Sequence, residues 1–121
     1  MRILITGGAA SGKSAYAEQR ALEWGEPLIY LATMRVYGDE DFQRVRRHRE
    51  MRASKGFTTI EFTDAGEFAQ ATEAIPERAT ILLEDLSNLV SNLLFDSDGH
   101  MCDANDAYHA IMTILAQLAE R

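Results

Sequence analysis

The chain alternates short apolar runs with longer stretches in which apolar residues recur every three or four positions. The short runs are rich in aliphatic, β-branched and aromatic residues and predict four strands. They lie at residues 3–5, 27–33, 57–62 and 80–83. The longer stretches predict helices. They lie at residues 15–24, 39–54, 64–75, 86–95 and 103–121. Strands that alternate with helices favour an α/β fold, in which a parallel sheet carries helices on both faces.

Polar residues and glycines mark where several of these helices begin and end. Asp39 and Asp64 precede periodic stretches and have side chains that can cap a helix N-terminus. Glu67 follows Asp64 by three positions, so the pair has the spacing of a capping box. Gly25 and Gly56 follow two of the predicted helices and are typical of helix C-termini. These signals support the predicted helix boundaries.

A glycine-rich segment joins the first predicted strand to the first predicted helix, and it fits the pattern G-x-x-x-x-G-K-[ST] of a phosphate-binding loop. Its residues are Gly7, Gly8, Ala9, Ala10, Ser11, Gly12, Lys13 and Ser14. Glycines let successive backbone N–H groups point at a phosphate, and the helix N-terminus adds partial positive charge. Lys13 is then placed to reach the β- and γ-phosphates of a nucleoside triphosphate, and Ser14 to hold Mg²⁺. We therefore predict a P-loop NTPase-like fold.

The composition limits the class of protein. At 121 residues the chain is expected to form a single nucleotide-binding domain, residues 1–121. A net charge of −7 argues against general binding of nucleic acid or of a membrane surface. No apolar run reaches the roughly 18 residues of a membrane span. Because a predicted strand begins at residue 3, we expect no signal peptide. The single cysteine, Cys102, excludes an internal disulfide and favours a reducing, cytoplasmic location.

Basic residues concentrate in one predicted helix, at residues 44–55. In an acidic chain with a phosphate-binding loop, this concentration favours a second contact with an anion, although a solvated helix face has the same pattern. His48 lies within the segment, on one helical arc with Arg44 and Arg52. An imidazole nitrogen can attack phosphorus, but spacing alone leaves a structural histidine as the more common interpretation.

Acidic residues follow the last predicted strand. In a phosphate-loop site, an acid at this position holds Mg²⁺, and both Glu84 and Asp85 qualify. We favour Glu84 because it follows the strand immediately; the alternative is that both acids cap the next helix. A metal site at His100, Cys102 and Asp103 is only weakly indicated, because the spacing matches no standard ligand pattern.

Several segments occur in an order that resembles one enzyme family. They are residues 3–14 (Ile-Leu-Ile-Thr-Gly-Gly-Ala-Ala-Ser-Gly-Lys-Ser), 30–33 (Tyr-Leu-Ala-Thr), 44–49 (Arg-Val-Arg-Arg-His-Arg), 59–61 (Thr-Ile-Glu), 82–84 (Leu-Leu-Glu) and 91–94 (Ser-Asn-Leu-Leu). The threonine and two glycines at the loop, combined with an Arg-x-x-x-His segment, are much more specific than a phosphate loop alone. From Arg2 to about Phe95, the chain is similar to the bifunctional adenosylcobinamide kinase/adenosylcobinamide-phosphate guanylyltransferases of cobalamin biosynthesis.

This resemblance implies two reactions and a set of site residues. Family members phosphorylate adenosylcobinamide with a nucleoside triphosphate, ATP or GTP, and Mg²⁺. They then transfer GMP from GTP, through a guanylated histidine, to adenosylcobinamide phosphate. By position His48 matches that histidine, Lys13 serves phosphoryl transfer, and Ser14 and Glu84 hold the metal. The nucleotide-binding positions implied outside the loop are Ala32, Thr33, Met34, Arg49, Glu61 and Glu84.

The resemblance also implies a longer protein. The family continues with a strand that bears an Asn-Glu-Val-Gly motif, which this sequence lacks, so we expect a fold truncated at its C-terminus. Relatives form symmetric oligomers, so we expect a homo-oligomer whose other partners are a corrinoid and a nucleotide. Two alternatives stay open: a different small-molecule kinase with a phosphate loop, and a non-catalytic module that binds a nucleotide.

Overall fold

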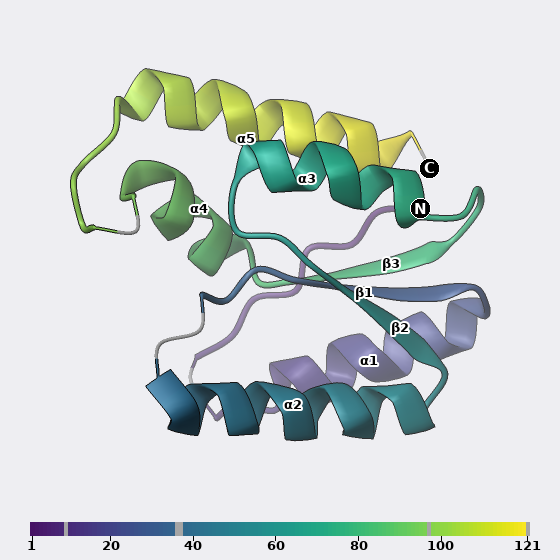
Figure 1. Cartoon of the computed structure of the whole chain (residues 1–121). Coiled ribbons are helices and arrows are strands. Elements are labelled where there is room, and N and C mark those ends of the chain that lie inside the picture. Colours follow the sequence, from purple (N-terminus) through teal and green to yellow (C-terminus); the bar gives the residue numbers. More distant parts are fainter. Residues whose placement is uncertain (9, 36–37, 97, 121) are drawn as a thin grey trace.

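The computed structural model describes residues 1–8, 10–35, 38–96 and 98–120. Over these ranges the chain forms a three-stranded parallel sheet with helices on both faces (Figure 1). Its elements are the helices α1 (Lys13–Trp24), α2 (Gly38–Ser54), α3 (Ala65–Ala71), α4 (Leu86–Leu94) and α5 (Ala104–Ala119), the 3₁₀ helix η1 (Thr72–Ala74), and the strands β1 (Leu28–Ala32), β2 (Phe57–Glu61) and β3 (Thr80–Glu84). This confirms the predicted α/β fold.

The strands lie in the order β2-β1-β3, so the first strand is central. Both neighbours run parallel to it and in level register. At the carboxyl end, Ala32 pairs with Glu61 on one side and with Glu84 on the other. Because the three strands end in one row, the residues that follow them meet at the same edge of the sheet, where ligands of α/β proteins bind.

The strand expected at residues 3–5 is wrong for this structure. No residue from 1 to 8 belongs to a strand. Ile3 and Leu4 are 43% and 77% exposed, respectively. A strand exists only through hydrogen bonds to a neighbour, and residues 3–5 form no ladder with the three strands that the structure describes. The apolar residues favour an extended backbone, but a strand also needs a neighbouring strand, and residues 3–5 do not determine whether one lies beside them.

Helix ends agree with the sequence at some positions and differ at others. Asp64 caps α3, since its Oδ1 accepts a hydrogen bond from the backbone N–H of Glu67 at 2.8 Å. The Glu67 carboxylate accepts instead from the N–H of Thr63 at 3.0 Å, so only half of the expected capping box forms. Asp39 lies inside the first turn of α2 rather than before it, where its charge still favours the helix N-terminus. Among the described helices, none is long and apolar enough to cross a membrane.

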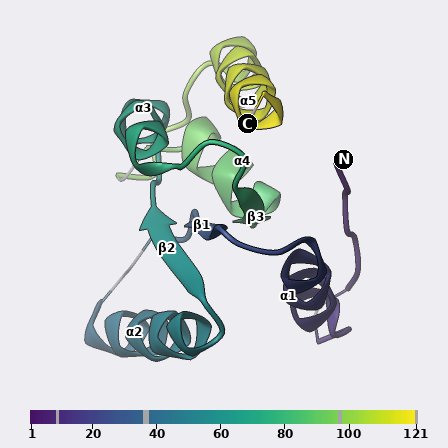
Figure 2. The same cartoon turned by 90° about the vertical axis from the view of Figure 1, so that its right-hand side faces the viewer.

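The core has two layers, one on each face of the sheet (Figure 2). Successive residues of a strand point to opposite faces, so β1 contributes to both layers. The larger layer faces α3, α4 and α5 and consists of Ile29, Leu31, Phe62, Phe68, Ala71, Ile75, Leu89 and Ile114. The smaller layer faces α1 and consists of Ala21, Leu28, Tyr30 and Phe57. Burial of these side chains fixes which face of β1 each residue occupies.

Two Phe→Ala substitutions, one in the core and one on the surface, are expected to differ strongly in their effect on stability. Phe62 is 1% exposed in the larger layer, whereas Phe42 on α2 is 60% exposed. We expect Phe62→Ala to lower the free energy of unfolding by about 3–5 kcal/mol, because it removes buried apolar contacts and leaves a cavity. We expect Phe42→Ala to change it by less than about 0.5 kcal/mol. Denaturant unfolding followed by circular dichroism measures both, and equal effects would contradict the core position of Phe62.

Candidate functional site

The glycine-rich segment forms a loop that leads into α1. Lys13 is the first residue of the helix, and no side chain in the described part of the chain caps this helix N-terminus. Its first N–H groups are therefore donors suited to an external anion. The backbone N–H of Ser11 and the Nζ of Lys13 both donate to the carbonyl of Gly8 at 3.3 Å, so the lysine folds back over the loop. Ala9 lies outside the described residues.

Two of the loop glycines occupy positions that a larger residue would disturb. Gly12 precedes α1 with a left-handed φ of 86°, a conformation that costs little only for glycine. A Cβ on Gly7 would lie 2.7 Å from the Oγ of Ser11, which is closer than nonbonded atoms approach. These two are the fixed glycines of the loop pattern: the left-handed backbone accounts for Gly12, and a side chain at Gly7 would require the Ser11 side chain to move.

Glu84 joins the loop to the sheet edge. It is the last residue of β3, and both of its carboxylate oxygens accept hydrogen bonds from hydroxyl groups. The Oγ of Ser14, in the first turn of α1, donates to Oε1. The hydroxyl of Tyr30, on β1, donates to Oε2 at 2.5 Å. One carboxylate therefore connects the phosphate-binding loop, the central strand and the last strand.

Asp85 has different surroundings from its neighbour. Its Oδ1 accepts from the backbone N–H of Asn88 at 2.6 Å and so caps α4. Its backbone is held by Thr33, whose buried hydroxyl donates to the Asp85 carbonyl at 2.8 Å and accepts from the Asp85 N–H at 3.0 Å. The capping alternative considered from the sequence thus describes Asp85, while Glu84 faces the loop.

A cleft of about 190 Å³ opens at the carboxyl ends of the strands. It collects residues from β1, α2, β3, α4 and the end of β2, which are far apart in the sequence. Its lining residues are Tyr30, Ala32, Met34, Val45, His48, Arg52, Glu61, Glu84, Asp85 and Asn88. Of the catalytic and nucleotide-binding positions implied by the resemblance, the cleft brings together Ala32, Met34, His48, Glu61 and Glu84.

Ion pairs neutralise several charges of the basic segment, residues 44–55, which covers most of α2 and the lysine that follows it. Arg49 lies 3.4 Å from Glu61 (Nη2 to Oε1), and this pair connects α2 to the end of β2. Lys55 lies 2.7 Å from Glu18 on α1 (Nζ to Oε2). The side chains of Arg49 and Lys55 are about half exposed. Water therefore weakens both ion pairs, and each contributes little to stability. The expected second contact with an anion stays a prediction.

Tyr30 and Arg52 form a contact that the sequence did not indicate. Arg52 is 8% exposed, and its guanidinium carbon lies 3.8 Å from the centre of the Tyr30 ring. The Nε of Arg52 also donates to the hydroxyl of Thr59 at 3.4 Å. The alternation of side chains along β1 could have indicated that Tyr30 lies near the site. Leu28, Tyr30 and Ala32 share one face of the strand, and that face ends at the cleft.

Burial raises the pKa of the Tyr30 phenol well above its ordinary value. The hydrogen bond to Glu84 and the negative charge of that carboxylate raise the pKa further, whereas the guanidinium of Arg52 lowers it. The net shift is upward, so the phenol stays protonated at neutral pH. Tyr30 is therefore a hydrogen-bond donor to Glu84 whenever that residue is a carboxylate.

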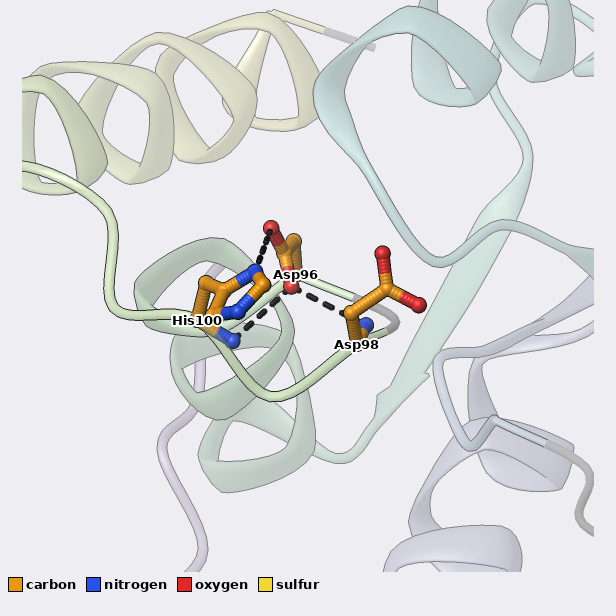
Figure 3. Close-up of side chains that lie close together, drawn as sticks. All are labelled: Asp96, Asp98 and His100. Atoms are coloured by element: carbon orange, nitrogen blue, oxygen red, sulfur yellow. Dashed lines mark hydrogen bonds and ion pairs between the residues drawn. The ribbon is translucent and has the colours of Figure 1, made fainter.

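Two carboxylates and an imidazole, from Asp96, Asp98 and His100, lie close together between α4 and α5 (Figure 3). The sequence weakly indicated His100, Cys102 and Asp103 as a set, but His100 instead lies beside Asp96, with 3.6 Å between Nδ1 and Oδ2. The Oδ1 of Asp96 accepts from the N–H groups of Asp98 and His100, and these bonds account for the turn. Asp103 caps α5.

Known proteins with similar sequences share one description. The family profile CobU, cobinamide kinase / cobinamide phosphate guanyltransferase, matches residues 3–121. The chain is 36% identical over 99 residues to the bifunctional adenosylcobalamin biosynthesis protein CobU of Escherichia coli strain K12. It is 38% identical over 100 residues to the protein of the same name from Salmonella typhimurium strain LT2. It is 34% identical over 121 residues to the bifunctional adenosylcobalamin biosynthesis protein CobP of Pseudomonas aeruginosa strain PAO1.

Each match covers a larger share of this chain than of the relative. The Escherichia and Salmonella matches cover 82% of this chain but 53% of each relative, so the chain spans about half the length of these two proteins. The Pseudomonas match covers all of this chain and 68% of the relative. No solved structure matches the chain. The profile match over residues 3–121 confirms the resemblance seen in the motifs, and this chain belongs to the cobinamide kinase / cobinamide phosphate guanyltransferase family.

Proposed function

We propose that this chain carries the nucleotide site of an enzyme with two activities. The enzyme phosphorylates adenosylcobinamide with ATP or GTP, and it transfers GMP from GTP to adenosylcobinamide phosphate. The family description and the relatives' names support this pair of reactions. The observation that carries the proposal is the hydrogen bond between Ser14 and Glu84, because it joins the phosphate-binding loop to the cleft that His48 lines.

The loop supplies the groups needed for phosphoryl transfer. In the proposed kinase step, a hydroxyl oxygen of the corrinoid bonds to the γ-phosphorus while the bond from that phosphorus to the β–γ bridging oxygen breaks. The nucleoside diphosphate leaves with the electrons of the broken bond, and the hydroxyl proton is released to solvent. Lys13 and the N–H groups at the start of α1 stabilise the negative charge on the transferred group. A hydroxyl and a carboxylate are oxygen ligands of the kind that Mg²⁺ prefers, and the Ser14–Glu84 hydrogen bond shows that these two oxygens converge. Bound Mg²⁺ would neutralise phosphate charge beside them.

His48 supplies the nucleophile for the proposed guanylyl transfer. One imidazole nitrogen attacks the α-phosphorus of GTP, a P–N bond forms, and pyrophosphate leaves with the electrons of the broken P–O bond. An oxygen of the corrinoid phosphate then attacks the same phosphorus, and the P–N bond breaks to restore the imidazole. His48 is exposed and lines the cleft, so a nucleotide held there can reach it.

The first prediction concerns nucleotide affinity. We expect Lys13→Ala to weaken binding of MgGTP and MgATP at least about tenfold, because a charge-assisted hydrogen bond to phosphate contributes about 1.5–3 kcal/mol. Arg78→Ala is the control, since Arg78 is an exposed basic residue that precedes β3, at the end of the strand opposite the cleft. Isothermal titration calorimetry measures both variants. Unchanged affinity in Lys13→Ala would contradict the proposed binding of the nucleotide phosphates by the loop.

The second prediction concerns the covalent intermediate. Incubation with GTP labelled at the α-phosphate should leave GMP on the protein through a bond that is labile to acid and stable to base, as a phosphoramidate is. We expect His48→Ala to abolish this label and His109→Ala to retain it. Labelling that persists in His48→Ala would exclude His48 as the nucleophile.

Product analysis separates the proposal from its two alternatives. Transfer of phosphate and of GMP to a corrinoid supports the proposed enzyme. Transfer of phosphate to another hydroxyl compound, with no covalent nucleotide on the protein, would indicate a different small-molecule kinase. Measurable GTP affinity with no transfer at all would indicate a nucleotide-binding module.

A further inference from the structure

The Glu84 carboxylate is held from two sides by groups on different elements. Ser14, on α1, donates to Oε1, and Tyr30, on β1, donates to Oε2. The proposed function uses only the first of these contacts. The second leaves the Tyr30 hydroxyl directed at a carboxylate that faces the phosphate-binding loop, and it has no assigned role.

The sheet register explains how Tyr30 reaches Glu84. Tyr30 is level with Leu82 on the neighbouring strand, and Leu82 and Glu84 are two residues apart, so they share a face. The long aromatic side chain extends diagonally along this face and places its hydroxyl beside the end of β3. A shorter side chain at the same position would not span two residues of the ladder.

The ring of Tyr30 is held on several sides. It is 7% exposed and packs edge-on against Phe57, with 6.3 Å between the ring centres. The guanidinium of Arg52 lies over its face at 3.8 Å, and Thr59 accepts a hydrogen bond from that arginine. A cation over an aromatic face and a tight apolar contact both restrict ring motion, so the hydroxyl is delivered at a defined point.

We propose that Tyr30 is a positioning residue: its hydroxyl holds the Glu84 carboxylate in the orientation that keeps Oε1 beside Ser14. This inference rests on the proposed role of Ser14 and Glu84 in holding a divalent cation. Hydrogen bonds to the far oxygen of a metal-binding carboxylate fix its rotation, and their loss typically weakens metal affinity by about 10–100-fold. In this role the Tyr30 hydroxyl acts on the metal only through the Glu84 carboxylate that it holds.

The test is the affinity for Mn²⁺ in the presence of a non-hydrolysable GTP analogue, measured from the electron paramagnetic resonance of free Mn²⁺. Tyr30→Phe removes only the hydroxyl and keeps the ring beneath Arg52 and against Phe57. We expect this variant to bind Mn²⁺ about 10–100-fold more weakly. We expect its affinity for the analogue in EDTA to be unchanged, because the loop is unaltered.

Controls separate positioning from packing. Tyr108→Phe removes the hydroxyl of a tyrosine that is 58% exposed on α5, and it should change neither affinity. Mn²⁺ affinity in Tyr30→Phe equal to that of the unmodified chain would overturn the positioning role. An equal loss of affinity for the analogue in EDTA would also overturn it, since Tyr30 would then serve the shape of the cleft.

A double substitution tests whether Tyr30 acts through Glu84. Glu84→Gln keeps the size of the side chain but removes its charge, and Mn²⁺ still binds through the triphosphate. We expect Tyr30→Phe to add little in the Glu84→Gln background, because the group that it positions has already been altered. The same fold loss in both backgrounds would overturn the inference. Absence of any nucleotide affinity in the unmodified chain would instead be a failure of the proposed function.

Discussion

The carboxylate of Glu84 is the point on which the arrangement of the candidate site depends. It lies at the end of β3 and receives hydrogen bonds from α1 and from β1, so it connects three elements that the chain forms separately. The level register of the parallel ladder makes this possible. Glu61, Ala32 and Glu84 form one row across the sheet, with neighbouring strands about 4.8 Å apart. Because Ala32 is small, the two carboxylates border an open cleft rather than a filled edge.

The helix α2 is held to the sheet differently from the helices on the opposite face. α3, α4 and α5 contribute buried apolar side chains to the larger layer. By contrast, the one buried residue of α2 is the charged Arg52, and ion pairs from Arg49 on the helix and from Lys55 just after it connect this segment to its neighbours. Exposed ion pairs stabilise weakly, so α2, which carries His48, is expected to open at lower free energy than the helices on the opposite face.

Individual residues show where sequence reasoning succeeds. Asp64 was expected to cap a helix and does so, because a cap depends on three or four neighbouring residues. The predicted loop pattern places Gly12 where the backbone is left-handed, for the same local reason. The strand expected at residues 3–5 fails because pairing with another strand is a property of the sheet and not of the run itself.

The sequence by itself determined the α/β class, the position of the glycine-rich loop before α1 and the family, since these depend on local periodicity and on short motifs. Only the tertiary structure decided which acid faces the loop and which caps a helix. It alone brought Tyr30 to Glu84 and buried Arg52 against the Tyr30 ring. The bonds to Glu84 join residues 70 and 54 positions apart, and such distances close only when the strands pair and the helices pack against them. No local pattern contains that information, because it arises from the register of the sheet.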